Sequence, residues 1–233
     1  GGKGIARVET ENGHQIIFVP NTIPGQKVLT RIAKKRRKYA EGKLLKVVAK
    51  SPDEVAVPYQ PISGAPFINL PVAKQREYKE ESTLAQYRKI GGVFNIAELF
   101  DTYIASPEDF NYRNKMEYSF SSIRQDLETG EEVDDAFALG FKTRGTWWKV
   151  ENLDQPDGLF DAEFETKLKE IRNFLQNTGL PAWHPPKKIG FFRHLVVRKS
   201  FDVNKLLINL VTSSQGIEGF DIEGFKNFMV DLL

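Results

Sequence analysis

The stretch FVPNTIPGQKV, residues 18–28, decides how the first part of the chain folds. It continues the alternating segment Gln15–Val19, and Pro20 then removes a backbone donor that a longer strand would need. The dipeptide Pro24-Gly25 is a turn signal, because proline fixes φ while glycine is free to take a positive φ. A new alternation begins at Val28. The stretch therefore predicts two strands joined by a tight connection.

Further short strands surround this stretch within residues 1–50. Ile5–Glu9 alternates before it, and Val28–Ile32 and Lys43–Val48 follow it. Four or five such strands are too few for an open sheet with a buried face, and a small closed barrel buries them best. We therefore expect a small OB-like β-barrel over residues 1–52.

The pattern changes after residue 52. Residues 53–70 are punctuated by proline and glycine and predict a linker. Strand and helix patterns then mix as far as residue 217. The predicted helices are Val72–Arg88 and Asp161–Asn177, and the predicted strands are Tyr112–Ile123, Phe137–Phe141 (paired with the first across an acidic loop, 125–135), Phe191–Ser200 and Lys205–Thr212.

The predicted fold class is therefore α+β. A small OB-like β-barrel (1–52) and a linker (53–70) precede a mixed α+β central domain with an antiparallel sheet (71–217). Residues 218–233 are expected to begin a further helix that leads out of the chain. Because the chain opens with Gly1 rather than methionine, a preceding piece is expected to be missing.

Composition excludes several classes of chemistry. The chain has no cysteine and only three histidines, without metal-ligand spacing, so disulfides, thiolate-held zinc, iron–sulfur clusters and cysteine nucleophiles are excluded. No apolar run approaches the roughly 18 residues of a membrane helix, and no signal peptide opens the chain. A cytoplasmic location follows by default, without a membrane partner.

The small net charge of +2 hides a strong asymmetry. Residues 1–50 hold twelve Lys and Arg against three Glu, a balance of +9, whereas residues 126–165 hold three cations against twelve acids, a balance of −9. Such separation of charge favours a basic face that binds a polyanion. Solvated charge on two surfaces is the alternative.

The densest basic run reads Lys34, Lys35, Arg36, Arg37, Lys38 and Tyr39, and it lies between two predicted strands. A loop that projects five adjacent cations suits contacts with phosphates, which dominate nucleic-acid affinity. The ring of Tyr39 can stack on a base, since stacking tolerates any sequence. This run is the first candidate RNA-binding site.

Several of these motifs together resemble a known family. GIARV (4–8), FVPNTIPGQKV (18–28) and KRRKYA (35–40) resemble a TRAM domain, an OB-like barrel of RNA-modifying enzymes. RKIGG (88–92), YRNKMEYSF (112–120), LGF (139–141) and RHLVVR (193–198) resemble the central domain of TRAM-containing RNA (uracil-5-)methyltransferases. The resemblance covers essentially the whole chain.

The resemblance adds candidate RNA contacts in the central domain. They are Arg113, Lys115, Arg193, His194 and Arg198. By strand parity, Arg113 and Lys115 share one face of their strand, and His194 and Arg198 share one face of theirs. The alternative is that Lys115 or Arg198 pairs with Glu117 or with the acidic loop.

The resemblance also implies what residues 1–233 lack. Family members continue into a methyltransferase domain that binds S-adenosylmethionine and carries a catalytic cysteine, so this chain by itself is expected to have no catalytic residue and no cofactor. Many members also hold an iron–sulfur cluster through cysteines that would fall within 57–67 and near Leu153, where this chain has none. The expected partners are structured RNA, either ribosomal or transfer RNA, and the missing domain in cis. A stand-alone RNA-binding module and a protein-interaction scaffold are the alternatives.

Overall fold

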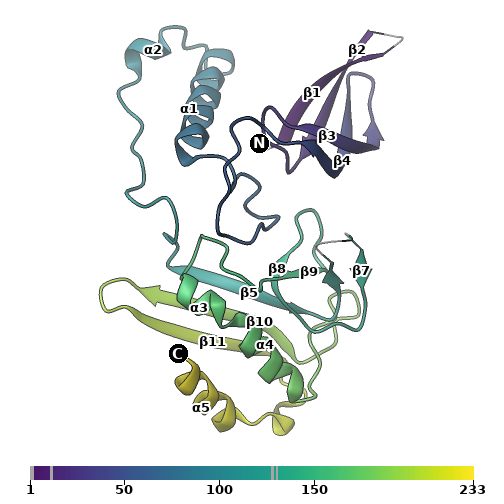
Figure 1. Cartoon of the computed structure of the whole chain (residues 1–233), viewed down its shortest axis with the longest axis vertical. Coiled ribbons are helices and arrows are strands. Elements are labelled where there is room, and N and C mark those ends of the chain that lie inside the picture. The colour runs from purple at the N-terminus through teal and green to yellow at the C-terminus, as the bar shows by residue number, and fades with distance from the viewer. Residues whose placement is uncertain (1–2, 11–12, 127–128, 130) are drawn as a thin grey trace. The chain divides into compact units, whose positions relative to one another are not determined.

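The computed structural model describes residues 3–10, 13–126, 129 and 131–233, which divide into two compact units (Figure 1). The first unit comprises residues 1–58 and 65–107, and the second comprises residues 59–64 and 108–233.

A four-stranded sheet dominates the first unit. Its strands are β1 (Lys3–Thr10), β2 (Gly13–Pro20), β3 (Lys27–Lys35) and β4 (Tyr39–Ala49), in the order β1-β2-β4-β3. Two antiparallel hairpins, β1–β2 and β3–β4, are joined by a parallel contact of three residue pairs between β2 and β4.

The expected closure into a barrel is not detected. Among the described residues no pairing joins β1 to β3, so these strands are the two edges of an open sheet. Our expectation assumed that most apolar residues of these strands need burial. Instead, Ile5 and Leu29 are 67% and 55% exposed, and the buried face is narrow, centred on Val19 and Ala40.

The predicted turn at Pro24-Gly25 is confirmed. Gly25 has a φ of +85°, and the backbone N–H of Ile23 donates to the side-chain oxygen of Gln26 over 3.1 Å. The amide of Gln26 in turn donates to Glu54 over 2.6 Å, and Glu54 also accepts from the backbone of Ser51. These bonds tie the turn to the segment that follows β4.

Two helices complete the first unit. Helix α1 (Val72–Lys89) matches the predicted helix, and Gly92 follows it with a φ of +66°. A one-turn helix, α2 (Ile96–Leu99), comes next.

A seven-stranded sheet forms the second unit, in the order β11-β10-β5-β8-β9-β6-β7. Its strands are β5 (Lys115–Ser121), β6 (Arg124–Gln125), β7 (Glu132–Val133), β8 (Ala138–Lys142), β9 (Val150–Asn152), β10 (Phe192–Ser200) and β11 (Lys205–Thr212). The described pairings are antiparallel except for a single parallel pair between β6 and β9. The short strands β6 and β7 replace part of the predicted acidic loop, of which residues 127, 128 and 130 lie outside the described residues.

Helices α3 (Ala162–Thr166) and α4 (Leu168–Asn177) lie over this sheet (Figure 1). The predicted single helix is thus divided at Lys167. Between helices and sheet lies an apolar core of fully buried side chains, among them Tyr118, Phe120, Phe164, Leu168, Phe192 and Leu195. A 3₁₀ turn (Ile217–Gly219) and α5 (Ile222–Leu232) follow, and the ring of Phe228 stacks on Phe174 of α4 with centroids 4.0 Å apart.

Residues 59–64, expected as part of the linker, are fixed to the second unit by Gln60. Its amide nitrogen donates to the carbonyl of Asn152 over 2.6 Å, and its amide oxygen accepts from the backbone N–H groups of Asp154 and Gln155. The backbone N–H of Gln60 donates to Pro156 over 2.8 Å. One side chain thus satisfies three backbone groups just beyond β9.

Candidate nucleic-acid interface

The basic run of the first unit forms the tip of the β3–β4 hairpin. Lys34 and Lys35 end β3, and Arg36–Lys38 make a turn closed by a 2.8 Å hydrogen bond from the backbone N–H of Arg36 to the carbonyl of Tyr39. All five cations, which we call the basic turn (Lys34–Lys38), are exposed, and none has an ion pair with any described residue. The basic turn therefore offers five free positive charges at one place.

Tyr39 lies at the start of β4 rather than in the turn. Its half-buried ring meets Phe18 of β2 edge-on, with centroids 5.6 Å apart and an interplanar angle of 78°. Tyr39 is thus part of the sheet surface and not of a projecting loop.

In the second unit, strand register gathers three of the candidate residues. His194 lies opposite Ser119, and Arg198 lies opposite Lys115, so Lys115, His194 and Arg198 share one face of the sheet. Lys115 also has an ion pair of 3.7 Å with Glu117. This pairing is the alternative to an RNA contact that the sequence left open for Lys115. Arg198 has no ion pair with the described residues.

Arg113 does not share this arrangement. Strand β5 begins only at Lys115, so the parity argument made for Arg113 does not apply. Its backbone N–H donates to Leu159 over 3.0 Å, and its side chain lies near the carbonyl of Lys115, at 3.4 Å. It is exposed and precedes the strand.

His194 is half-buried among charged groups. Burial lowers its pKa below 6.5, Glu117 at 3.5 Å raises it, and the nearby cations Lys142 and Arg193 lower it further. The net shift is downward, so the imidazole is neutral at pH 7 and offers a hydrogen bond rather than a charge. Lys142 was missed from the sequence, because no motif marks it, and its proximity to His194 depends on the pairing of β10 with β5, which the sequence did not predict.

Arg193 lies outside this face. The register of β10 shifts between Phe192 and His194, which leaves Arg193 exposed at an irregularity. Its guanidinium lies over the indole ring of Trp183, 4.3 Å from the centroid. This contact positions a cation that keeps its outer side open to solvent.

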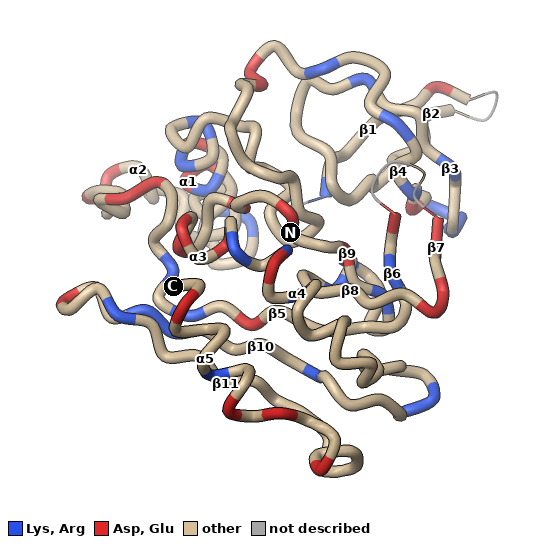
Figure 2. The backbone as a smooth tube through the Cα atoms, turned by 60° about the horizontal axis from the view of Figure 1, so that its bottom comes forward, with Lys and Arg blue, Asp and Glu red and all other residues tan. Residues whose placement is uncertain are grey.

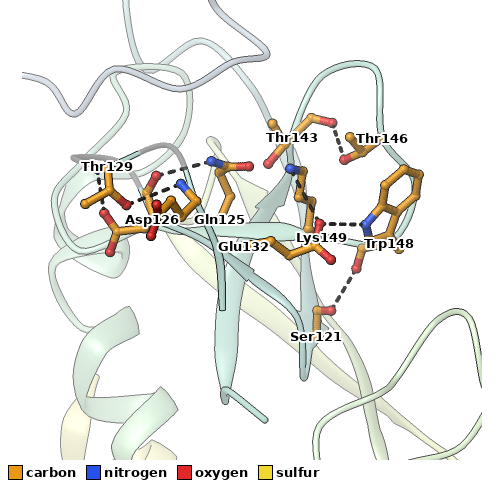
Figure 3. A network of polar contacts seen from close by, with 10 residues as sticks. Ser121, Gln125, Asp126, Thr129, Glu132, Thr143, Thr146, Trp148 and Lys149 are labelled. Carbon is orange, nitrogen blue, oxygen red and sulfur yellow. Dashed lines mark hydrogen bonds and ion pairs between the residues drawn. The ribbon is translucent and has the colours of Figure 1, made fainter. Parts of the chain in front are cut away.

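The acidic part of the second unit is partly neutralised by its own cations. Figure 3 shows Glu132 of β7 accepting from the indole nitrogen of Trp148 over 3.1 Å, with Lys149 at 3.6 Å. Arg124 pairs with Asp126 at 3.4 Å. In Figure 2 acidic residues mark β7 and the turn beside it, and basic residues mark β3.

A buried carboxylate cluster lies inside the second unit and has no exposed surface. Tyr118 donates to one oxygen of Glu165 over 2.8 Å, and the backbone N–H of Asp157 donates to the other over 2.8 Å. Burial, followed by the charge of Asp157, raises the pKa of Glu165 to about 8. All three side chains are 0% exposed, so the cluster is structural and cannot meet a substrate.

Metal and membrane sites are not found in the described part of the chain. No group of three or more His, Asp or Glu is arranged to hold a metal ion there, and no described helix is long and apolar enough to cross a bilayer. The absence of cysteine rules out a thiolate-ligated iron–sulfur cluster in this chain.

Comparison with known proteins defines the class to which this fold corresponds. A family model described as the TRAM domain matches residues 1–45, so the chain contains a TRAM domain. It is 34% identical over 205 residues to an uncharacterised RNA methyltransferase of Clostridium acetobutylicum and 30% identical over 204 residues to one of Clostridium tetani. Each alignment covers 85% of this chain and 42% of the relative.

A solved structure shares the fold. The crystal structure of the Pyrococcus abyssi tRNA (uracil-54, C5)-methyltransferase, in complex with S-adenosyl-L-homocysteine, matches 94% of this chain and 49% of that chain, with a TM-score of 0.60 and 23% identity. The chain is therefore homologous to RNA methyltransferases and spans less than half the length of those relatives.

Proposed function

We propose that this chain is the RNA-binding, substrate-recognition portion of an S-adenosylmethionine-dependent RNA uracil-C5 methyltransferase. The main support is the basic turn, because its five exposed cations lie at one hairpin tip without an ion pair to any described residue, and such a cluster attracts phosphates strongly. Homology to RNA methyltransferases supports RNA as the polyanion.

The second unit contributes a smaller set of contacts in this proposal. Arg198 and Lys115 supply charge on the face of the seven-stranded sheet, and neutral His194 supplies a hydrogen bond. Arg193, stacked on Trp183, adds a guanidinium at the irregularity of β10. Arg113 is the weakest member of this set, since it precedes β5 and strand register does not place it with the others.

Methyl transfer itself is assigned to a domain outside residues 1–233. Uracil C5 becomes nucleophilic only after a nucleophile adds to C6, and this chain has no thiol for that step. A cofactor pocket of the usual kind lies at the carboxyl ends of parallel strands. The described sheets are built of antiparallel hairpins apart from two short parallel contacts. S-adenosylmethionine is thus proposed as the cofactor of the longer protein alone.

Two measurements on residues 1–233 test this proposal. A fluorescein-labelled RNA hairpin should bind at low salt in an anisotropy titration, and calorimetry with S-adenosylmethionine should give no binding heat. Absence of RNA binding would contradict the proposed role of the chain in RNA recognition. Micromolar binding of the cofactor would show that the boundary between recognition and catalysis is misplaced.

A further inference from the structure

The charges of the four-stranded sheet are divided unequally between its two faces. Cross-strand pairs fix which side chains share a face, because residues directly opposite each other point the same way. In the described strands, the face that buries Val19 and Ala40 carries one cation, Lys35 of the basic turn. We call the opposite one the outer face; its members in the four strands are Lys3, Ile5, Arg7, Glu9, His14, Ile16, Phe18, Pro20, Lys27, Leu29, Arg31, Lys34, Tyr39, Glu41, Lys43, Lys46 and Ala49.

In the described strands, the outer face thus holds seven cations against two carboxylates, Glu9 and Glu41. Arg31 lies directly opposite Lys43, a like-charge pair that costs stability in an isolated sheet. Lys34 lies opposite Glu41, and neither makes an ion pair within 4 Å of any residue that the structure describes. Such an arrangement is favourable when a polyanion lies across it.

Aromatic and aliphatic side chains occupy the centre of the same face. Ile5, Phe18 and Glu41 are consecutive partners across β1, β2 and β4, and Ile16 pairs with Tyr39 in the neighbouring row. The rings of Phe18 and Tyr39 are half-buried and meet edge-on, so each keeps part of its surface in solvent. Ile5 beside them is 67% exposed.

We infer that the outer face binds unpaired nucleotides of RNA, with bases stacked on Phe18 and Tyr39 and phosphates on Arg7, Arg31 and Lys43. Aromatic side chains stack only on bases that are free of a duplex, and flanking cations hold the backbone of such a strand. A duplex would need the cations but not the rings. This inference rests on the proposed RNA-binding function and extends it from the basic turn to the outer face of the sheet, with which the turn shares Lys34, and it names a class of ligand.

The test uses residues 1–233 with a labelled octauridylate, a single strand that cannot form a stable duplex. Phe18→Leu keeps an apolar side chain but removes the aromatic face, and it should weaken binding by at least fivefold, as expected for loss of one base–aromatic stack, worth about 1 kcal/mol or more. Phe18→Tyr keeps the ring and should bind like the wild type. Thermal melting of each variant verifies that the sheet is folded.

A second measurement tests the outer-face site on the wild type and therefore does not depend on whether Phe18→Leu folds. Irradiation of the wild-type complex with octauridylate containing 5-iodouridine should cross-link the RNA to tryptic peptides 8–27 or 39–43, which carry Phe18 and Tyr39. Cross-links confined to peptides from other segments would overturn the inference.

The outcomes separate this inference from the proposed function. If the RNA hairpin binds while Phe18→Leu leaves octauridylate binding unchanged, the outer-face site is wrong and the RNA-binding role stands. If neither RNA binds to the wild type, both are wrong. Loss in Phe18→Leu with retention in Phe18→Tyr supports the site.

Discussion

Arg198 of β10 lies directly opposite Lys115 of β5, so two cations face each other across neighbouring strands. The first sheet repeats this relationship with Arg31 opposite Lys43. Like charges in this position oppose strand pairing, and they recur here on sheet faces that carry further cations. Both sheets therefore hold like charges opposite each other at a surface, an arrangement that opposes strand pairing and suits the RNA contacts that we propose.

Replacement of Arg198 should accordingly stabilise the second unit. Arg198→Thr removes the repulsion and introduces a residue that favours strands, so the free energy of unfolding should rise by up to about 1 kcal/mol. Arg198→Lys, which keeps the charge, is the matched control and should show little gain. Urea unfolding measures both. A loss of stability in Arg198→Thr would show that the side chain makes a stabilising contact.

The same variant should bind RNA less well. Arg198 is proposed to contact a phosphate, and a single exposed contact contributes modestly, so Arg198→Thr should show a several-fold weaker affinity at low salt. Anisotropy with the RNA hairpin measures the change. Equal affinity of Arg198→Thr and the wild type would remove Arg198 from the interface.

Glu165 should make stability depend on pH. Its pKa of about 8 in the folded state lies above the ordinary value of 4.5, so the folded protein binds the proton more tightly than the unfolded chain. The free energy of unfolding should then fall as pH rises from about 4.5 to 8, by at most about 1.4 kcal/mol per pH unit from this group.

Glu165→Gln provides the comparison, because glutamine imitates the protonated acid. The variant should gain stability relative to the wild type as pH increases from 5 to 8, and the difference should level off above pH 8. Urea titrations at pH 5, 6, 7, 8 and 9 measure it. A difference independent of pH would mean that Glu165 titrates normally.

Gln60 should be the main attachment of residues 59–64 to the second unit. Gln60→Ala removes three hydrogen bonds and leaves the N–H groups of Asp154 and Gln155 without that acceptor, at a cost of about 1–3 kcal/mol. Gln155→Ala, at an exposed position, is the control and should change stability by less than about 0.5 kcal/mol. If the two variants unfold at the same urea concentration, the attachment lies elsewhere.

Local features of the fold could be read from the sequence. The Pro24-Gly25 turn, helix α1 and the β10–β11 hairpin depend on residues close together in the chain, so periodicity and turn chemistry were enough to predict them. The predicted closure of the first sheet into a barrel is not detected among the residues that the structure describes, and it was hard to judge from the sequence because it depends on whether two distant edge strands meet.

The outer face could not be predicted, because bulges interrupt the alternation. Arg31 and Lys34 are three residues apart and would lie on opposite faces of a regular strand. The irregularity between Ile32 and Lys34 returns both to one face, opposite Lys43 and Glu41. In the second unit, likewise, only the pairing of distant strands brings Lys142 close to His194.

The salt dependence of RNA binding tests the central claim most directly. The affinity of residues 1–233 for the labelled RNA hairpin is measured between low and physiological salt, for the wild type and for a variant with Ser at Lys34, Lys35, Arg36, Arg37 and Lys38. Each phosphate contact contributes about 0.7 to 0.9 to the slope of log affinity against log salt, so loss of the basic turn should reduce that slope by up to about 4. A variant with Ser at Lys187 and Lys188 serves as the control and should keep the wild-type slope. Equal slopes for the wild type and the five-residue variant would contradict the assignment of the basic turn as the RNA-binding element.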